Sequence, residues 1–197
     1  MSVSERNPYV FEQPIEEPSD FVGREGILEA CWTVLRRPNH AKLSLVGGPG
    51  SGKTSVLRQL LNPAQQQQRL SPNSPSPLLY VDCRAIMDAE DFLCQVSRTL
   101  ITKLPSDLAK EYCEPVTDDS TLSYLLEDLP RLPALLVDHF CSLINNQTVL
   151  AEVSRILRGW IQDIGVPTII ASSKPLRLCV PAREAGSSLA GIFNNDE

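Results

Sequence analysis

A glycine-rich loop is the first feature of the sequence that points to chemistry. Residues 47–54 read Gly-Gly-Pro-Gly-Ser-Gly-Lys-Thr and fit the pattern G-x-x-x-x-G-K-[ST]. Glycines let successive backbone N–H groups turn toward one phosphate at the positive end of a helix. Lys53 is then placed to reach the β- and γ-phosphates, and the Thr54 hydroxyl to ligate Mg²⁺. We therefore predict a nucleotide phosphate site made by Gly47, Gly48, Pro49, Gly50, Ser51, Gly52, Lys53, Thr54 and Ser55.

A magnesium ion bound to Thr54 also needs a carboxylate from the end of a neighbouring buried strand. Asp138 follows the apolar residues 135–137 and has this placement. Asp82, which follows residues 79–81, is the alternative. We favour Asp138 because its strand stands between two strongly periodic helices, whereas Asp82 is explained as polar punctuation at a strand end.

The residue after Asp138 bears on hydrolysis. Many hydrolytic enzymes with this loop have a glutamate there to polarise the attacking water, and this chain has His139. A neutral imidazole is a weaker base, and His139 is equally well explained as a loop residue at a strand end. We expect slow or absent hydrolysis.

Two other segments argue against GTP as the nucleotide. Residues 138–141 do not fit D-x-x-G, and residues 172–175 lack the aspartate of an N-K-x-D guanine clamp. We also recognise no arginine-rich lid of the kind that small-molecule kinases have, which argues against that class of enzyme.

The elements that must position these residues alternate along the chain. Apolar runs predict strands, and amphipathic patterns with a period of 3.6 residues predict helices between them. Continuous apolar strands separated by such helices are typical of a parallel sheet covered on both faces. The fold class predicted is therefore α/β, a three-layer arrangement with a mostly parallel sheet flanked by helices. The strands are expected at 42–46, 77–82, 134–138 and 166–171, and the main helices near 27–37, 53–61, 89–104, 119–129 and 149–164.

Proline and polar residues set the domain limits. Residues 1–20 predict an extended arm, 21–193 the core, and 194–197 a tail. Within the core, residues 62–77 have low complexity and few apolar side chains. Such a segment buries too little surface to offset its ordering entropy, so we expect an exposed, mobile insertion.

Charge and cysteine usage exclude several classes of function. The 18 basic and 24 acidic residues leave a formal charge of −6, which argues against broad, charge-driven binding to nucleic acid or anionic lipid and leaves a local basic groove open. The six cysteines form no C-x-x-C pair and only two histidines accompany them, so a zinc site is not expected. No apolar run approaches the roughly 20 residues of a membrane span. We predict a cytoplasmic protein with reduced thiols.

Upstream of the loop, residues 21–25 read Phe-Val-Gly-Arg-Glu. Together with the glycine-rich loop, this segment resembles the hhGRE motif of STAND-type and origin-recognition-type ATPases, which belong to the AAA+/ASCE group. The preceding residues 7–14 resemble the arm of bacterial members. The resemblance implies a P-loop NTPase fold that binds ATP or ADP with Mg²⁺. It also implies that Val22, Gly23 and Arg24 lie against the adenine, although a helix-start turn with a surface arginine explains the same residues.

The resemblance implies further roles near the C-terminus. Ser172 or Ser173, at the tip of the fourth strand, takes the place of the family's γ-phosphate sensor. Arg177 or Arg183 would supply an arginine finger to a neighbouring subunit. In the family a fifth strand and a helical lid follow a segment like 187–193, so we expect a core whose lid is absent.

The function expected from all of this is a nucleotide-dependent switch in a signalling or defence assembly, with protein partners or further copies of the chain. One alternative is an interaction module that retains the loop but works without nucleotide. The other is a DNA-associated AAA+ regulator, which requires steeply salt-dependent DNA binding. The acidic charge gives the DNA-associated alternative little support.

Overall fold

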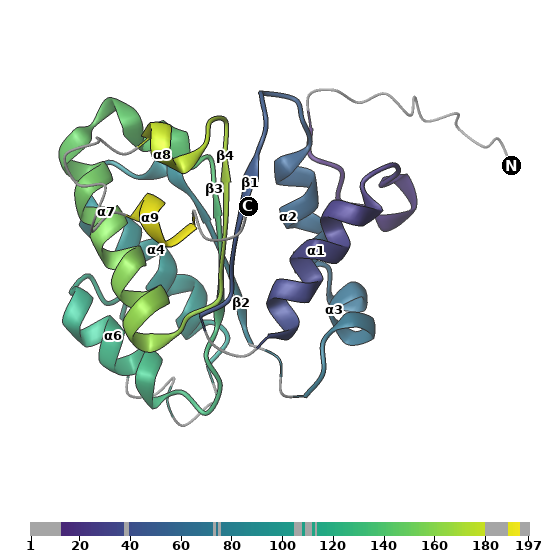
Figure 1. Ribbon diagram of the computed structural model, residues 1–197. Coiled ribbons are helices and arrows are strands. Elements are labelled where there is room, and N and C mark those ends of the chain that lie inside the picture. Colours follow the sequence, from purple (N-terminus) through teal and green to yellow (C-terminus); the bar gives the residue numbers. More distant parts are fainter. Residues whose placement is uncertain are drawn as a thin grey trace, which may run out of the picture.

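The fold is a parallel sheet between two layers of helices (Figure 1). A computed structural model describes residues 13–37, 40–72, 74, 76–104, 108, 112, 114–179 and 189–193, and the statements below concern these. The strands are β1 (Lys42–Val46), β2 (Leu78–Asp82), β3 (Ala134–Asp138) and β4 (Thr168–Ser172). The sheet has the order β1-β4-β3-β2 with every pair parallel. The predicted fold class is confirmed.

Different helices cover the two faces of the sheet. One face packs against α1 (Glu25–Arg36) and α2 (Lys53–Leu61), and α3 (Pro63–Arg69) lies on the same side of the sheet, against α2 (Figure 1). The other lies beneath α4 (Ala89–Ile101), α6 (Asp119–Asp128), α7 (Gln147–Gly159) and α9 (Leu189–Phe193). The connections include η1 (Pro18–Asp20), η2 (Cys83–Ala85), η3 (Phe140–Asn145), the π-helical turn η4 (Trp160–Ile164) and α8 (Leu176–Cys179).

Alternation along the strands divides the core into two clusters. Leu135 and Val137 of β3 belong to the cluster under α4 and α7, whereas Leu136 belongs to the cluster beneath α1 and α2. All five residues of β3 and of β4 are buried, as expected for central strands of a covered parallel sheet. The same alternation decides which way the polar residue at the end of each strand faces.

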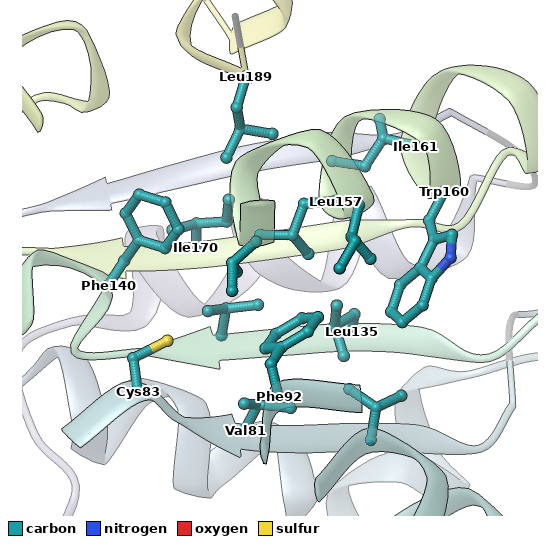
Figure 2. Packing of buried hydrophobic residues seen from close by; sticks show 14 of the residues in the cluster. Val81, Cys83, Phe92, Leu135, Phe140, Leu157, Trp160, Ile161, Ile170 and Leu189 are labelled. Carbon is teal, nitrogen blue, oxygen red and sulfur yellow. The ribbon is translucent and has the colours of Figure 1, made fainter. Parts of the chain in front are cut away.

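Phe92, Phe140 and Trp160 lie among the aliphatic side chains of the cluster under α4 and α7 (Figure 2). Phe92 of α4 stacks on Trp160, with ring centroids 5.9 Å apart and an interplanar angle of 29°. The Trp160 indole N–H donates to Ser123 Oγ at 3.0 Å, which satisfies the one polar atom of that ring. The helix ends at Gly165, whose φ of 90° lies in the left-handed region that glycine adopts without strain.

Part of the segment 62–77, which was expected to be an exposed, mobile insertion, forms the helix α3, which has no buried residue. Asn62 caps α3 by accepting from Ala64 N at 3.0 Å, and Pro63 occupies the first helical position. Arg69 then pairs with Glu29 of α1 at 2.6 Å and accepts from Arg36 Nε at 3.0 Å. These contacts tie the glutamine-rich helix to α1, an interaction between distant residues that composition does not reveal.

The described end of the predicted arm lies against the helix that follows the glycine-rich loop. Ile15 N donates to Ser55 Oγ at 3.0 Å, and Gln59 Nε2 donates to the carbonyls of Ile15 and Glu16, both at 3.0 Å. Both α2 side chains are buried. Residues 1–12 and the tail 194–197 lie outside the described residues. In the described part of the chain, no helix has the length and apolar character needed to cross a membrane.

Candidate functional site

The carboxyl ends of the four strands bring the predicted site residues to one edge of the sheet. Val46 pairs with Ser172, and Asp82 with Asp138. The loop 47–52 leaves β1 at this edge and opens α2. Crevices at the carboxyl ends of parallel strands are where α/β folds bind ligands. The sheet order therefore gathers residues that lie far apart in the sequence.

The glycine-rich loop has the backbone that its sequence predicts. Gly50 and Gly52 have φ values of 70° and 76°, in the left-handed region, and Gly52 is the N-cap of α2. Gly47 N donates to the carbonyl of Ser172 at 3.2 Å, which fastens the start of the loop to β4. The loop thus stands at the N-terminus of α2, where the helix dipole favours a bound anion.

The ammonium of Lys53 lies folded back on the loop. It donates to the carbonyl of Gly47 at 2.5 Å, to that of Gly48 at 3.0 Å, and to Ser51 Oγ at 3.1 Å. A lysine ammonium has three donors and no acceptor, so these three contacts satisfy it without a ligand. Phosphate oxygens would have to replace some of them.

Asp138 is held rigidly at the end of β3. Its side chain is fully buried; Oδ2 accepts from the Tyr80 hydroxyl at 3.0 Å, and Oδ1 accepts from His139 N at 2.8 Å. Burial, reinforced by the Asp138 carboxylate, raises the pKa of the Tyr80 hydroxyl, so Tyr80 remains a donor at neutral pH. Asp138 shares the strand face of Leu136, the face covered by α2.

His139 lies between the two predicted magnesium ligands. Its Nε2 is 3.4 Å from Thr54 Oγ1 and 3.6 Å from Asp138 Oδ2, and its backbone has a φ of 53°. The Thr54 hydroxyl and the Asp138 carboxylate are oxygen donors of the kind that Mg²⁺ prefers. The donor chemistry therefore fits a magnesium ion, but the imidazole occupies the space between these donors and would have to turn away.

Asp82, the alternative carboxylate, is engaged elsewhere. Arg84 Nη2 lies 2.6 Å from its Oδ2, and Arg84 N donates to Oδ1 at 3.0 Å. Burial raises the pKa of Asp82, but the hydrogen bonds from Arg84 outweigh this effect and hold the pKa below its usual value. Of the two carboxylates, Asp138 contacts His139, whose imidazole also reaches Thr54.

The Ser172 side chain does not face the loop in the way its predicted sensor role requires. Ser172 follows the alternation of Ile170, whose side chain lies under α7, and its buried hydroxyl donates to the carbonyl of Lys174 at 2.5 Å. A hydroxyl has a single proton to donate, and phosphate oxygens only accept. Because the Ser172 proton is already donated to Lys174, this hydroxyl has none to offer a phosphate. Ser173 is exposed, and its backbone N–H donates to Cys141 Sγ at 3.3 Å.

The motif at residues 21–25 reaches the loop through its arginine. A Cβ placed on Gly52 would lie 3.2 Å from Arg24 Cζ, so the guanidinium packs directly against the last glycine of the loop. Gly23, with a φ of 85°, donates its N–H to Glu25 Oε1 at 3.0 Å, and Val22 is 80% exposed. The structure therefore places Arg24 beside the phosphate loop. Of the two predicted arginine fingers, Arg177 is exposed on α8 and Arg183 lies outside the described residues.

Sequence reasoning missed two residues that support the site: Tyr80 holds Asp138, and Arg58 of α2 lies over the Tyr80 ring at 4.5 Å. Ser55, which was predicted to belong to the phosphate site, has its hydroxyl bonded to the arm. Tyr80 lies two residues before Asp82, which pairs with Asp138 in the sheet. Tyr80 could therefore be predicted as a partner of Asp138 only from the strand register together with the sequence.

Comparison with known proteins identifies the family. The model of the AAA domain family matches residues 39–178, well over half of the chain. A comparison with curated proteins found no match. The matched residues contain the glycine-rich loop and all four strands of the parallel sheet.

Two solved structures share the fold. AMPPCP-bound DnaA from Aquifex aeolicus is 17% identical with a TM-score of 0.50, and the alignment covers 94% of this chain and 49% of that one. A chain of Drosophila ORC bound to DNA is 15% identical with a TM-score of 0.56, covering 96% and 50%. The chain thus spans about half the length of these structures. The chain is a P-loop protein of the AAA domain family.

Proposed function

We propose that this AAA domain binds ATP or ADP with Mg²⁺ and acts as a nucleotide-dependent switch that hydrolyses ATP slowly. The observation that carries the proposal is the Lys53 ammonium, held inside a glycine loop at the start of α2. That ammonium is bonded only to neutral oxygens, which negatively charged phosphate oxygens would outcompete. The AMPPCP-bound DnaA fold supports a nucleotide as the ligand.

The residues around the loop divide the work of binding. Loop N–H groups and Lys53 bind phosphate oxygens, and Arg24 adds positive charge beside Gly52. Thr54 and Asp138 would hold the metal ion, with Tyr80 fixing the Asp138 carboxylate. A bound Mg²⁺ supplies charge neutralisation for the β- and γ-phosphates. These contacts favour binding and orientation of a nucleotide over its rapid turnover, because no carboxylate follows Asp138.

The switch is proposed to act through the arm and through the motif at residues 21–25. The arm is bonded to Ser55, the residue after Thr54, and Arg24 lies on Gly52. A nucleotide that reorders the loop would therefore change the contacts of both segments. Such differential contacts are what shifts a conformational equilibrium. A role in signalling or defence, with protein partners or further copies of the chain, remains part of this proposal.

The proposal is tested by calorimetric titration of the full chain with ATP and ADP in the presence of Mg²⁺. We expect both nucleotides to bind, and steady-state phosphate release to stay well below about 1 s⁻¹, the low end of ordinary turnover. Absence of binding would favour the nucleotide-independent module. Steeply salt-dependent binding to duplex DNA would favour the DNA-associated regulator.

Removing the His139 ring is expected to strengthen Mg²⁺-dependent nucleotide binding. In His139→Gly the space between Thr54 and Asp138 opens, and glycine adopts the φ of 53° without strain. A net hydrogen bond contributes about 0.5–1.5 kcal/mol, so we expect a two- to tenfold lower Kd for ADP with Mg²⁺, measured by calorimetry.

His40 provides the matched control for this experiment. It has a φ of 57°, and its Nδ1 lies 2.9 Å from the carbonyl of Ile161, near the opposite edge of the sheet. His40→Gly should leave the magnesium dependence of binding unchanged. An equal Mg²⁺ dependence in wild type and His139→Gly would show that the ring does not obstruct the metal.

A further inference from the structure

Two cysteines meet beside the nucleotide site. Cys141 lies in η3, directly after β3, and Cys179 ends α8, after β4. Their sulfurs are 3.4 Å apart although 38 residues separate them in the sequence. The remaining described cysteines are Cys31 and Cys83, which are buried, and Cys94, which is half-buried on α4. A sulfur–sulfur contact this short places two thiols within reach of a covalent bond.

The two thiols have different surroundings. Cys141 is half-buried and accepts a hydrogen bond from Ser173 N at 3.3 Å. Cys179 is buried, and its thiol lies 3.5 Å from the carbonyl of Pro175 and 3.7 Å from that of Lys174. Cys141 is therefore the more exposed of the two residues and its sulfur faces a donor, whereas Cys179 is enclosed and its sulfur lies beside acceptors.

The acidities of the thiols follow from these contacts. Burial opposes ionisation of Cys141, but the hydrogen bonds from Ser173 and Cys179 outweigh it and lower the pKa of its thiol. Burial, together with the bond to Cys141, raises the pKa of Cys179 to about 12. The thiolate is the reactive form of cysteine, so Cys141 is suited to react first and Cys179 to resolve the product.

We propose that Cys141 and Cys179 form a redox-active dithiol that hydroperoxides oxidise to an intramolecular disulfide. The Cys141 thiolate attacks a peroxide oxygen, the O–O bond breaks, and the departing oxygen takes a proton and leaves as water or an alcohol. The Cys141 sulfenic acid is then attacked by the Cys179 sulfur as that thiol loses its proton. The S–O bond breaks, the released hydroxide becomes water, and the S–S bond forms. Two thiols have given two electrons to one peroxide.

The geometry makes this closure short. The sulfurs must approach from 3.4 Å to about 2.05 Å, a movement of about 1.4 Å. The bond would join η3, which begins two residues after Asp138, to α8, which follows the Ser172–Lys174 turn. The disulfide would therefore cross-link the segments after β3 and β4. Its formation does not rest on the proposed nucleotide function.

The test uses the full reduced chain exposed to hydrogen peroxide, then alkylated and digested for mass spectrometry without reductant. We expect one cross-linked peptide that contains Cys141 and Cys179, on a monomeric chain, and that dithiothreitol releases. Cys179→Ser should abolish the cross-link and let a dimedone adduct accumulate on Cys141. Cys141→Ser should abolish both products.

Cys94→Ser is the matched control, because Cys94 is also half-buried but lies on α4. It should retain the full yield of the cross-linked peptide. Three results would overturn the proposal: over-oxidation of Cys141 in wild type without a cross-link, a disulfide from Cys141 to another cysteine, or a disulfide between chains. Each readout is chemical, so a failure to bind nucleotide would refute the proposed function without touching this inference.

Discussion

Replacing Lys53 by alanine is expected to weaken ATP binding by about ten- to 150-fold. The ammonium lies inside the loop, where it donates to Gly47 O, Gly48 O and Ser51 Oγ. With nucleotide bound, those donors would face phosphate oxygens, and a hydrogen bond to a charged group contributes about 1.5–3 kcal/mol. Calorimetric titration of wild type and Lys53→Ala with ATP measures the ratio of the two Kd values.

A second lysine separates the loss of one ammonium from a general change in charge. Lys42 begins β1, at the end of the strand opposite the loop. Lys42→Ala carries the same change in net charge and should bind ATP as wild type does. Thermal unfolding without nucleotide should be similar in both variants. Equal ATP affinity in wild type and Lys53→Ala would contradict a phosphate site at this loop.

The parts of this protein that could be predicted from the sequence depend on neighbouring residues. Strands β1 and β3 have the predicted bounds, because a short apolar run that ends in glycine or a charged residue marks a buried strand by itself. The glycine loop is equally local: its conformation follows from residues 47–54 and from the helix that they open. The N-cap of α4 is local too: Asp88 accepts from Asp91 N at 2.8 Å.

The parts that could not be predicted depend on the order of the strands. β4 lies between β1 and β3, and only that order sets Ser172 beside the loop with its side chain on the α7 face. His139 reaches Thr54 because β3 directs Asp138 toward α2. The sequence identifies these residues as candidates, but their side-chain directions follow from pairing between strands that are far apart in the chain.

Two further features were hidden for the same reason. The contact between Cys141 and Cys179 joins segments that follow different strands, and no spacing rule relates them. The helix α3 had a local signal in Asn62 and Pro63, but its attachment to the core comes from Glu29 of α1. Composition alone did not predict this attachment, because Arg69 and Glu29 lie 40 positions apart in the sequence.

Replacing Phe92 by alanine is expected to lower the free energy of unfolding by about 3–5 kcal/mol. Phe92 is fully buried and stacks on Trp160, with strands β2 and β3 beneath it (Figure 2). The variant loses the buried apolar surface of the ring. It also leaves a cavity between α4 and α7, because the surrounding structure relaxes only partly into the space. Since domains are stable by about 5–15 kcal/mol, this is a large share of the total.

Tyr124 of α6 is the control for this loss of an aromatic ring, because 69% of its surface is exposed. Chemical denaturation should give a free energy of unfolding for Tyr124→Ala within about 0.5 kcal/mol of wild type. The slope of that free energy against denaturant should stay the same in both variants, since the surface exposed on unfolding hardly changes. An equally small loss in Phe92→Ala would mean that α4 and α7 do not enclose the ring.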